Sequence, residues 1–312
     1  MTLLLFLSSR CGECLRIGSV TQKGAVACRG LPHRREVGFR NQQGPDHVSP
    51  TTSGSTLSAG LAAWAVATDA ASAAGVDIRE LRGNEVMLAQ EAFGQVWGPQ
   101  LIPQEVLLRA LAHVGCTLLC AVVDERPVRM TLGFLGWEGG VHLHSHMTAV
   151  VHAYRSVGVG YALKLGQEPS VCARYTQVRW TYDPLVAHNA YFNLVRLGAV
   201  VVSLHTNFYG AMVDTVNAGD ESDRFEVSWR LDSPRVLAAL SGHPHPPTDV
   251  VRSHVILEDY TALARSEPAA AQEARLAARG ALLAAQDERL AVEWDSGAYR
   301  LTRRALAAGH GG

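Results

Sequence analysis

An apolar segment that runs through two glycines into a helix-compatible segment most restricts the fold of this chain. Residues 147–151 are apolar, Arg155-Ser-Val-Gly158-Val-Gly160 follows, and residues 161–165 suit the first turns of a helix. A strand that turns through glycines into a helix directs several backbone N–H groups and the positive end of the helix dipole at one point. The arginine adds a charge that suits the same anion. The segment therefore predicts a site for the pyrophosphate of a nucleotide-containing cofactor.

The two glycines alone leave a plainer alternative open. Gly158 and Gly160 would also serve a simple turn, because glycine adopts positive φ without steric cost. The segment lacks the third glycine of the Gly-x-Gly-x-x-Gly fingerprint, which argues against a Rossmann dinucleotide site. The residues around the turn, and their order, therefore have to support the assignment.

That order resembles the acyl-CoA-binding motif of the GNAT acyltransferase superfamily. In the family a valine is followed, after four or five residues, by Arg/Gln-x-x-Gly-x-Gly/Ala between the fourth strand and the third helix. Val150, Tyr154, Arg155, Gly158 and Gly160 fit this pattern. The resemblance continues through Trp180-Thr-Tyr-Asp-Pro-Leu185, Asn189-Ala190, Leu197-Gly198-Ala199, Asn207-Phe-Tyr-Gly210, Asn217-Ala-Gly219, Asp223-Arg224 and Trp229-Arg-Leu231. It covers about residues 76–303 and is similar to a poorly characterised bacterial branch of predicted GNAT acetyltransferases.

The resemblance implies an N-acyltransferase that uses acetyl-CoA or another acyl-CoA and transfers the acyl group directly to an amine. The acceptor would be a small molecule or a peptide, and the sequence does not identify it. A non-catalytic protein of the same fold that binds acyl-CoA as a ligand or sensor is the alternative. The residues that the resemblance assigns to the cofactor are Val150, Arg155, Val157, Gly158, Val159, Gly160, Tyr161 and Asn189.

The main candidates for catalysis are His146, Asp183 and Tyr209. In GNAT enzymes the strand before the cofactor loop often carries the base that deprotonates the amine, and His146 lies nine residues before Arg155. An imidazole titrates near neutral pH and suits that role; His144 is the second choice. Asp183, where a buried strand opens into a loop, would orient an amine or act as the base, or would instead form an Asx turn.

The family's usual general acid is missing. Many GNAT enzymes have a tyrosine four residues before the glycine that ends the fourth helix, and it protonates the leaving thiolate. Here the glycine is Gly198 and the position holds Leu194. Tyr209 is a substitute candidate, although a buried tyrosine with one hydrogen bond is the simpler interpretation. A thiolate is also a fair leaving group without a dedicated acid.

Three histidines alternate along residues 142–146, so His142, His144 and His146 point to one face of a strand. Three imidazoles on one face suggest zinc. Side chains two residues apart on a strand are about 7 Å from each other, which is too far for all three to reach one ion. No cysteine or carboxylate adjoins them, so we expect no metal site. The histidines are then either structural, solvated or hydrogen-bonded, or they include the catalytic base.

Composition excludes several classes of protein. The 312-residue chain is 47% apolar and has a net charge of −1, which gives no electrostatic footprint for nucleic acid or anionic lipid. No apolar run approaches the roughly 20 residues of a membrane span. Cys11 and Cys14 have no second pair at a metal-site spacing, and the other cysteines are scattered. We expect a cytoplasmic protein with acyl-CoA and an amine as partners, and allow for a homodimer.

Apolar periodicity predicts a mixed α/β sheet with helices on both faces. Strands are expected at 76–81, 117–123, 128–137, 141–151, 178–182, 200–204 and 225–231, and helices at 84–96, 103–114, 161–173 and 187–197. The last of these strands would close the sheet. Residues 1–70 are polar and Gly/Ser-rich, which predicts a disordered extension. The acyltransferase domain would span 71–234 and a Pro/His-rich linker 235–250. Residues 251–303 (a strand, an Ala-rich helix and a hairpin) would pack on it.

Overall fold

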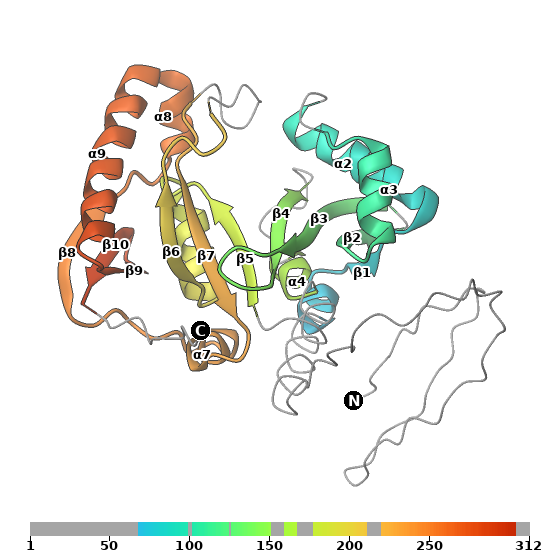
Figure 1. Cartoon of the computed structure of the whole chain (residues 1–312), viewed down its shortest axis with the longest axis horizontal. Helices are drawn as coiled ribbons and strands as arrows, with labels where there is room; N and C mark the ends of the chain where they lie inside the picture. Colours follow the sequence, from blue (N-terminus) through green and yellow to red (C-terminus); the bar gives the residue numbers. More distant parts are fainter. Residues whose placement is uncertain are drawn as a thin grey trace, which may run out of the picture. The chain divides into compact units, whose positions relative to one another are not determined.

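The described residues form a seven-stranded sheet with the order β1-β2-β3-β4-β5-β7-β6 (Figure 1). The computed structural model describes residues 68–98, 102–124, 126–150, 159–166, 177–210 and 220–303. All of them lie in the second of two compact units of the chain, residues 50–312. The strands are β1 (Asp77–Glu80), β2 (Thr117–Val123), β3 (Arg126–Gly136), β4 (His142–Val150), β5 (Gln177–Tyr182), β6 (Val200–His205) and β7 (Arg224–Arg230).

One neighbouring pair in this sheet is parallel, and the other pairs are antiparallel. β4 and β5 run in the same direction, and α4 (Val159–Gly166) lies in the chain between them, as a parallel connection requires. The last strand in sequence, expected to close the sheet, instead lies between β5 and β6. Phe225, Val227 and Trp229 of β7 are almost fully buried, as expected for a strand inside the sheet. The edge strand of this half of the sheet is β6, and β1 is the edge strand of the other half.

Helices pack on both faces of the β1–β4 half of the sheet. They include α2 (Val86–Trp97), which follows the 3₁₀ turn η1 (Gly83–Glu85), and α3 (Glu105–His113). Because side chains alternate along a strand, Cys120 of β2 packs with Phe93 of α2 and Leu108 of α3, whereas Ala121 packs on the opposite face with Leu163 of α4. The predicted mixed sheet with helices on both faces is confirmed.

The β5–β7–β6 half of the sheet packs on a helix of unusual form. α6 (Ala187–Ala190) continues directly into the π-helical turn η4 (Tyr191–Arg196), and the two together match the helix expected at 187–197. The N–H of Leu197 bonds to the carbonyl of Phe192, five residues earlier, which is the π spacing. Trp229 of β7 donates its indole N–H to the carbonyl of Leu197 at 2.8 Å, which satisfies one of the last carbonyls of the helix.

The C-terminal residues share a core with this half of the sheet. They form α7 (Pro234–Leu240), β8 (Val250–Val255), α8 (Tyr260–Ser266), α9 (Pro268–Asp287), β9 (Ala291–Asp295) and β10 (Ala298–Thr302). The strands make a second sheet in the order β8-β10-β9. Tyr299 of β10 packs edge-on against Phe225 of β7 at 5.5 Å between ring centroids. Gln286 of α9 accepts a hydrogen bond from the N–H of Leu204 at 2.7 Å, so α9 also caps the edge strand β6.

Two expected boundaries need correction. The linker expected at 235–250 begins with helix α7, because the Ser233 side chain accepts a hydrogen bond from the N–H of Val236 at 3.2 Å and Pro234 suits the first turn. Residues 68–70, expected within the disordered extension, belong to a helix over 68–73, and Ala71 packs with Val76 and Leu163. The sequence did not predict this helix, because its short alanine and serine side chains show no clear apolar periodicity. Residues 1–67 lie outside the described ranges.

No helix within the described ranges combines the length and the apolar composition that crossing a membrane requires.

Candidate functional site

The split between β4 and β5 is the main irregularity of the sheet. The two strands pair only through Leu143 with Val178 and His144 with Arg179. From Ser145 onward β4 continues along β3 as far as Val150, while β5 continues along β7 as far as Tyr182. The two neighbours therefore run apart, and beyond His144 the described strands leave the β5-facing edge of β4 without a register partner (Figure 1). An unpaired strand edge inside a sheet can accept an extended ligand.

A β-bulge lies on β4 just where the split begins. Ser145 pairs with Gly133 of β3 and Met147 pairs with Leu132, so His146 is the extra residue of the bulge. An extra residue of this kind leaves the hydrogen-bond ladder and turns its backbone and side chain in a new direction. The alternation of β4 places Ser145 on the face covered by α4 and the histidines on the other face.

The histidines expected on one face of the strand do share that face. The ring centroids of His142 and His144 are 6.5 Å apart, and those of His144 and His146 are 6.0 Å apart. His142 is buried and its Nδ1 hydrogen-bonds to the carbonyl of Gly140 at 2.7 Å. Within the described residues, no group of three His, Cys, Asp or Glu side chains is placed to hold a metal ion.

The other two histidines are held neutral by their surroundings. Burial, followed by the neighbouring histidines, lowers the pKa of His144 to about 4. Partial burial also lowers the pKa of His146 below its ordinary value. His146 is nevertheless exposed, and its ring lies 5.4 Å from that of Phe134. An exposed, neutral imidazole beside the split is able to accept a proton.

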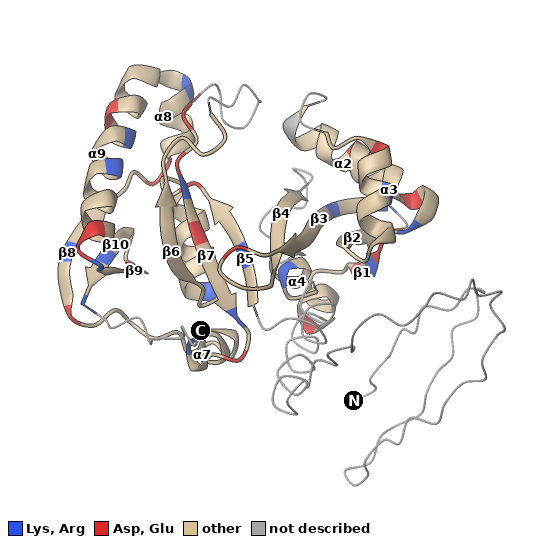
Figure 2. Ribbon diagram, in the orientation of Figure 1, with Lys and Arg blue, Asp and Glu red and all other residues tan. Residues whose placement is uncertain are grey.

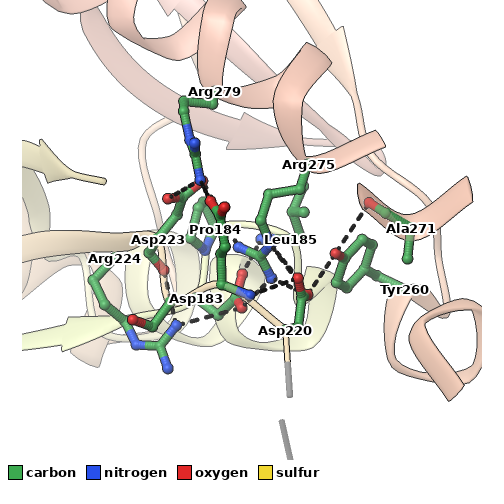
Figure 3. Close-up of polar contacts among 12 residues, drawn as sticks. Asp183, Pro184, Leu185, Asp220, Asp223, Arg224, Tyr260, Ala271, Arg275 and Arg279 are labelled. Atoms are coloured by element: carbon green, nitrogen blue, oxygen red, sulfur yellow. Dashed lines mark hydrogen bonds and ion pairs between the residues drawn. The ribbon is translucent and has the colours of Figure 1, made fainter. Parts of the chain in front are cut away.

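Asp183, which follows β5 directly, is enclosed by partners (Figure 3). Its Oδ1 accepts the N–H of Leu185 at 2.8 Å, which is the Asx turn considered from the sequence. Its Oδ2 accepts from Arg275 of α9 at 2.8 Å and from Arg224 of β7 at 3.4 Å. Arg275 is almost fully buried and also bonds to Asp220 through both Nε and Nη2.

The same cluster extends to both sides of Asp183. Arg279 of α9 binds Asp223 at 2.8 Å and also contacts Glu221, so basic residues of α9 face the acidic segment before β7 (Figure 2). Tyr260 of α8 donates its hydroxyl to Asp220 at 2.6 Å. We call Asp183, Asp220, Glu221, Asp223, Arg224, Tyr260, Arg275 and Arg279 the α9 ion-pair cluster.

Tyr209 lies against this cluster. The guanidinium carbon of Arg224 is 5.5 Å from the centre of the Tyr209 ring, and the Tyr209 hydroxyl is 3.3 Å from that of Thr181 on β5. The side chain is exposed rather than buried. The structure thus brings Tyr209 and Asp183 together through Arg224, while His146 lies on the other strand of the split.

The expected cofactor segment is described in part. Val150 is the last residue of β4, and Val159, Gly160 and Tyr161 begin α4. Arg155, Val157 and Gly158 lie outside the described residues. The segment therefore joins the split strand β4 to the start of α4, which is the position that a phosphate-binding turn requires. Asn189 is half-buried in the first turn of α6, and its N–H bonds to the carbonyl of Val186 at 2.9 Å.

Leu194, at the place of the family tyrosine, is buried within η4. Its neighbour Asn193 is also buried and accepts the indole N–H of Trp180 at 3.0 Å. Both side chains thus serve the core, and neither presents an acid to the split.

Two polar groups at the split were missed from the sequence. Glu226 of β7 bonds to His205 of β6 at 3.0 Å and to Arg179 of β5 at 3.5 Å. Although burial opposes it, these partners lower the pKa of Glu226. Lys164 of α4 donates to Ser145 of β4 at 2.7 Å. The only sequence signal for the contact between Lys164 and Ser145 was a lysine within an otherwise apolar helix. The contacts of Glu226 with His205 and Arg179 depend on the order of the strands in the sheet, and no local sequence pattern reveals that order.

Comparisons with known proteins give structural matches alone. No family model and no curated protein matches the chain. The solved structures that match include smu.2055 from Streptococcus mutans, at 16% identity over 50% of this chain and 99% of that one, with a TM-score of 0.42. Naa50 of Arabidopsis thaliana, bound to a bisubstrate analogue, matches at 15% identity over 49% and 97%, with a TM-score of 0.38. The ribosomal-protein-S18-alanine N-acetyltransferase of Escherichia coli matches at 12% identity over 50% and 94%, with a TM-score of 0.39.

These similarities concern about half of the chain and say nothing of its substrate. The fold itself is visible in the strands. The mixed sheet with helices on both faces agrees with the arrangement that the resemblance implied. Within the described residues from β1 to β7, this is the mixed α/β arrangement expected for a GNAT-like fold.

Proposed function

We propose that this protein transfers an acyl group from acetyl-CoA or another acyl-CoA to an amine. The observation that carries the proposal is the split between β4 and β5, which opens beside the start of α4. A cofactor with a pyrophosphate at one end and an extended amide-bearing arm at the other suits this arrangement. The helix start would take the phosphates, and the open edge of β4 would pair with the arm as an added strand.

The cofactor would be held by the residues that the motif assigns. Arg155 and the backbone N–H groups of 157–161 would bind the pyrophosphate, with Val150 and Asn189 beside the arm. Replacing Gly158 with Val would crowd the phosphates, and Arg155→Ala should weaken CoA binding by about 1–3 kcal/mol, as for the loss of a charged hydrogen bond. Calorimetry with CoA measures both effects. Unchanged affinity in both variants would reject the cofactor assignment.

For the base we propose His146. Its imidazole is exposed at the bulge and has a lowered pKa, so it is neutral and able to accept a proton at neutral pH. Asp183 meets two guanidinium groups and a backbone N–H, so its oxygens are already engaged. We assign Asp183 to shaping the mouth of the split, and Tyr209 to protonating the leaving thiolate if any side chain does so. The acceptor amine would attack the thioester carbonyl directly.

A non-catalytic acyl-CoA-binding protein is the second candidate. Leu194 favours it, because a buried leucine replaces the acid that the family motif has at this position. Release of free thiol from acetyl-CoA in the presence of a panel of amines separates the two functions. Amine-dependent release supports the enzyme, whereas tight CoA binding without turnover over a wide panel supports the binding protein.

A further inference from the structure

Lys164 and Ser145 form a buried pair that the proposed transfer does not use. Lys164 Nζ is 2.7 Å from Ser145 Oγ and 3.6 Å from the centre of the Trp180 ring. Lys164 is 7% exposed and Ser145 is 4% exposed. Within the described residues no carboxylate forms an ion pair with this amine. A buried ammonium normally has such a partner, because the cost of removing a charge from water is large.

The Lys164–Ser145 pair lies at the point where β4 and β5 stop pairing. Ser145 is the first residue of β4 beyond the last pair that joins β4 to β5, and Trp180 holds the same place on β5. Lys164 touches both, so its amine lies at the closed end of the split, on the face covered by α4. The thioester of a bound acyl-CoA would enter this split under the proposed function.

The surroundings favour a neutral amine. Burial lowers the pKa of Lys164 well below that of a free lysine. A neutral lysine amine beside a serine hydroxyl is a known way to activate the oxygen, since the amine accepts the proton as the oxygen attacks. The bulge adds a donor: His146, directly after Ser145, has no register partner on β3. Under the proposal below, its backbone N–H would stabilise an oxyanion formed next to Ser145.

We propose that Ser145 is a nucleophile with Lys164 as its base, and that the protein cleaves acyl-CoA through an acyl-serine when no amine is bound. Lys164 takes the Ser145 proton while Oγ forms a bond to the thioester carbonyl carbon. The carbon–sulfur bond then breaks, and the thiolate leaves as CoA with the proton from Lys164. Water attacks the ester in the second step, with Lys164 again as the base, and releases the carboxylic acid and free Ser145.

This proposal depends on acyl-CoA binding in the split, so it rests on the proposed function. It differs from direct transfer in whether an amine is required before thiol is released. Direct transfer needs the amine before any thiol is released. An acyl-serine forms without an amine, and it leaves a covalently bound acyl group on the peptide that contains Ser145.

The test is to incubate the full chain with acetyl-CoA in the absence of amines, quench it with acid at short times and measure the intact mass. We expect a gain of one acetyl group, mapped to Ser145 and removed by hydroxylamine, which cleaves esters and spares amides. Ser145→Ala and Lys164→Met should lose this label and lower amine-independent thiol release at least roughly tenfold. Ser228→Ala on β7 is the control for loss of a partly buried hydroxyl in the same sheet, and it should behave as the wild type.

Ser145→Cys guards against a variant that fails to fold, because a thiol in this position should carry the acetyl group as a thioester. Calorimetry with CoA separates a failure of the proposed function from a failure of the acyl-serine proposal. No CoA binding rejects the proposed function itself. CoA binding with no trapped ester, or with a hydroxylamine-resistant amide on Lys164, rejects the acyl-serine and leaves the transferase intact.

Discussion

Arg275 Nη2 on α9 lies 2.8 Å from Asp183 Oδ2 at the end of β5, although 92 positions separate the two residues. The same nitrogen lies 2.7 Å from Asp220 Oδ2, just before β7. One guanidinium from the C-terminal residues thus ties the residue that follows β5 to the segment that precedes β7. The side chain is 2% exposed, so this is a buried cluster rather than a surface ion pair.

The first prediction concerns the stability that this cluster provides. Arg275→Met should destabilise the protein by about 3–5 kcal/mol, because it leaves Asp183 and Asp220 without their shared partner in a poorly hydrated place. Urea unfolding measures the change. Arg300→Met is the matched control: Arg300 bonds to Asp295 and Ser253 on the protein surface, and its loss should cost less than about 1 kcal/mol. Equal losses of unfolding free energy in the two variants would show that the α9 ion-pair cluster does not stabilise the fold more than a surface ion pair does.

A second prediction contrasts two glycines. Gly198 has a φ of +68°, and an added Cβ would lie 2.9 Å from both the Ala239 Cβ and the Arg235 carbonyl oxygen. Gly198→Ala should therefore destabilise by at least about 1–2 kcal/mol. Gly280 lies inside α9 with nothing within 4 Å of an added Cβ. Gly280→Ala should stabilise by about 0.5–1 kcal/mol, since alanine favours a helix. Thermal unfolding of both variants tests the signs, and the same sign in both would contradict the explanation.

Local patterns predicted most strands and helices because those elements bury one face each. Residues 117–123 were predicted as a strand with the bounds that β2 has, and β9 and β10 form the hairpin expected within residues 251–303. The position of β7 inside the sheet was not predictable in this way. It depends on which strand pairs with which, and that is decided by contacts between distant residues such as Phe225 and Tyr299.

The site was predictable to the extent that single motifs define it. The glycine turn located the junction of β4 and α4, and the alternating histidines shared a face as expected. The partners of Asp183 were not predictable, because Arg275 is one of several arginines on a helix and nothing nearby singles it out. The π-helical turn also escaped prediction, since its apolar spacing resembles that of an ordinary helix over so short a span.

A third prediction follows from the neutral histidines. In the unfolded chain His144 has an ordinary pKa near 6.5, and in the folded protein its pKa is about 4. Between these values the unfolded chain binds more protons, so stability should fall as the pH drops from about 6.5 to 4. The full shift corresponds to at most about 3–4 kcal/mol, and solvent screening should reduce it. Urea unfolding at several pH values measures the slope.

Glu226 and Asp220 also have lowered pKa values, and their protonation contributes to acid instability over a lower pH range. A variant separates these effects from that of the histidine. His144→Gln should flatten the wild-type slope between about pH 4 and 6.5 while leaving the loss of stability at lower pH. A slope that survives the substitution unchanged would mean that His144 is not the titrating group.

The last prediction concerns the proposed base. A base must be unprotonated to work, and the pKa of His146 lies below its ordinary value. With His146 as the base, kcat/KM should rise with pH through a pKa below about 6.5 and then stay level. His146→Ala should remove this limb and slow turnover by roughly a hundredfold, with CoA affinity nearly unchanged because the ring is on the strand face away from α4.

Two comparisons make this result specific to His146. The acceptor amine loses its own proton over some pH range and produces a rising limb of its own, so wild type and variant must be compared with the same amine. His144→Ala serves as the matched control, because its ring lies 6.0 Å from that of His146 on the same strand. The His144 variant should keep the limb, shifted at most. A limb that persists in His146→Ala, or disappears in both variants, would remove His146 from the mechanism and assign the strand's histidines to structure.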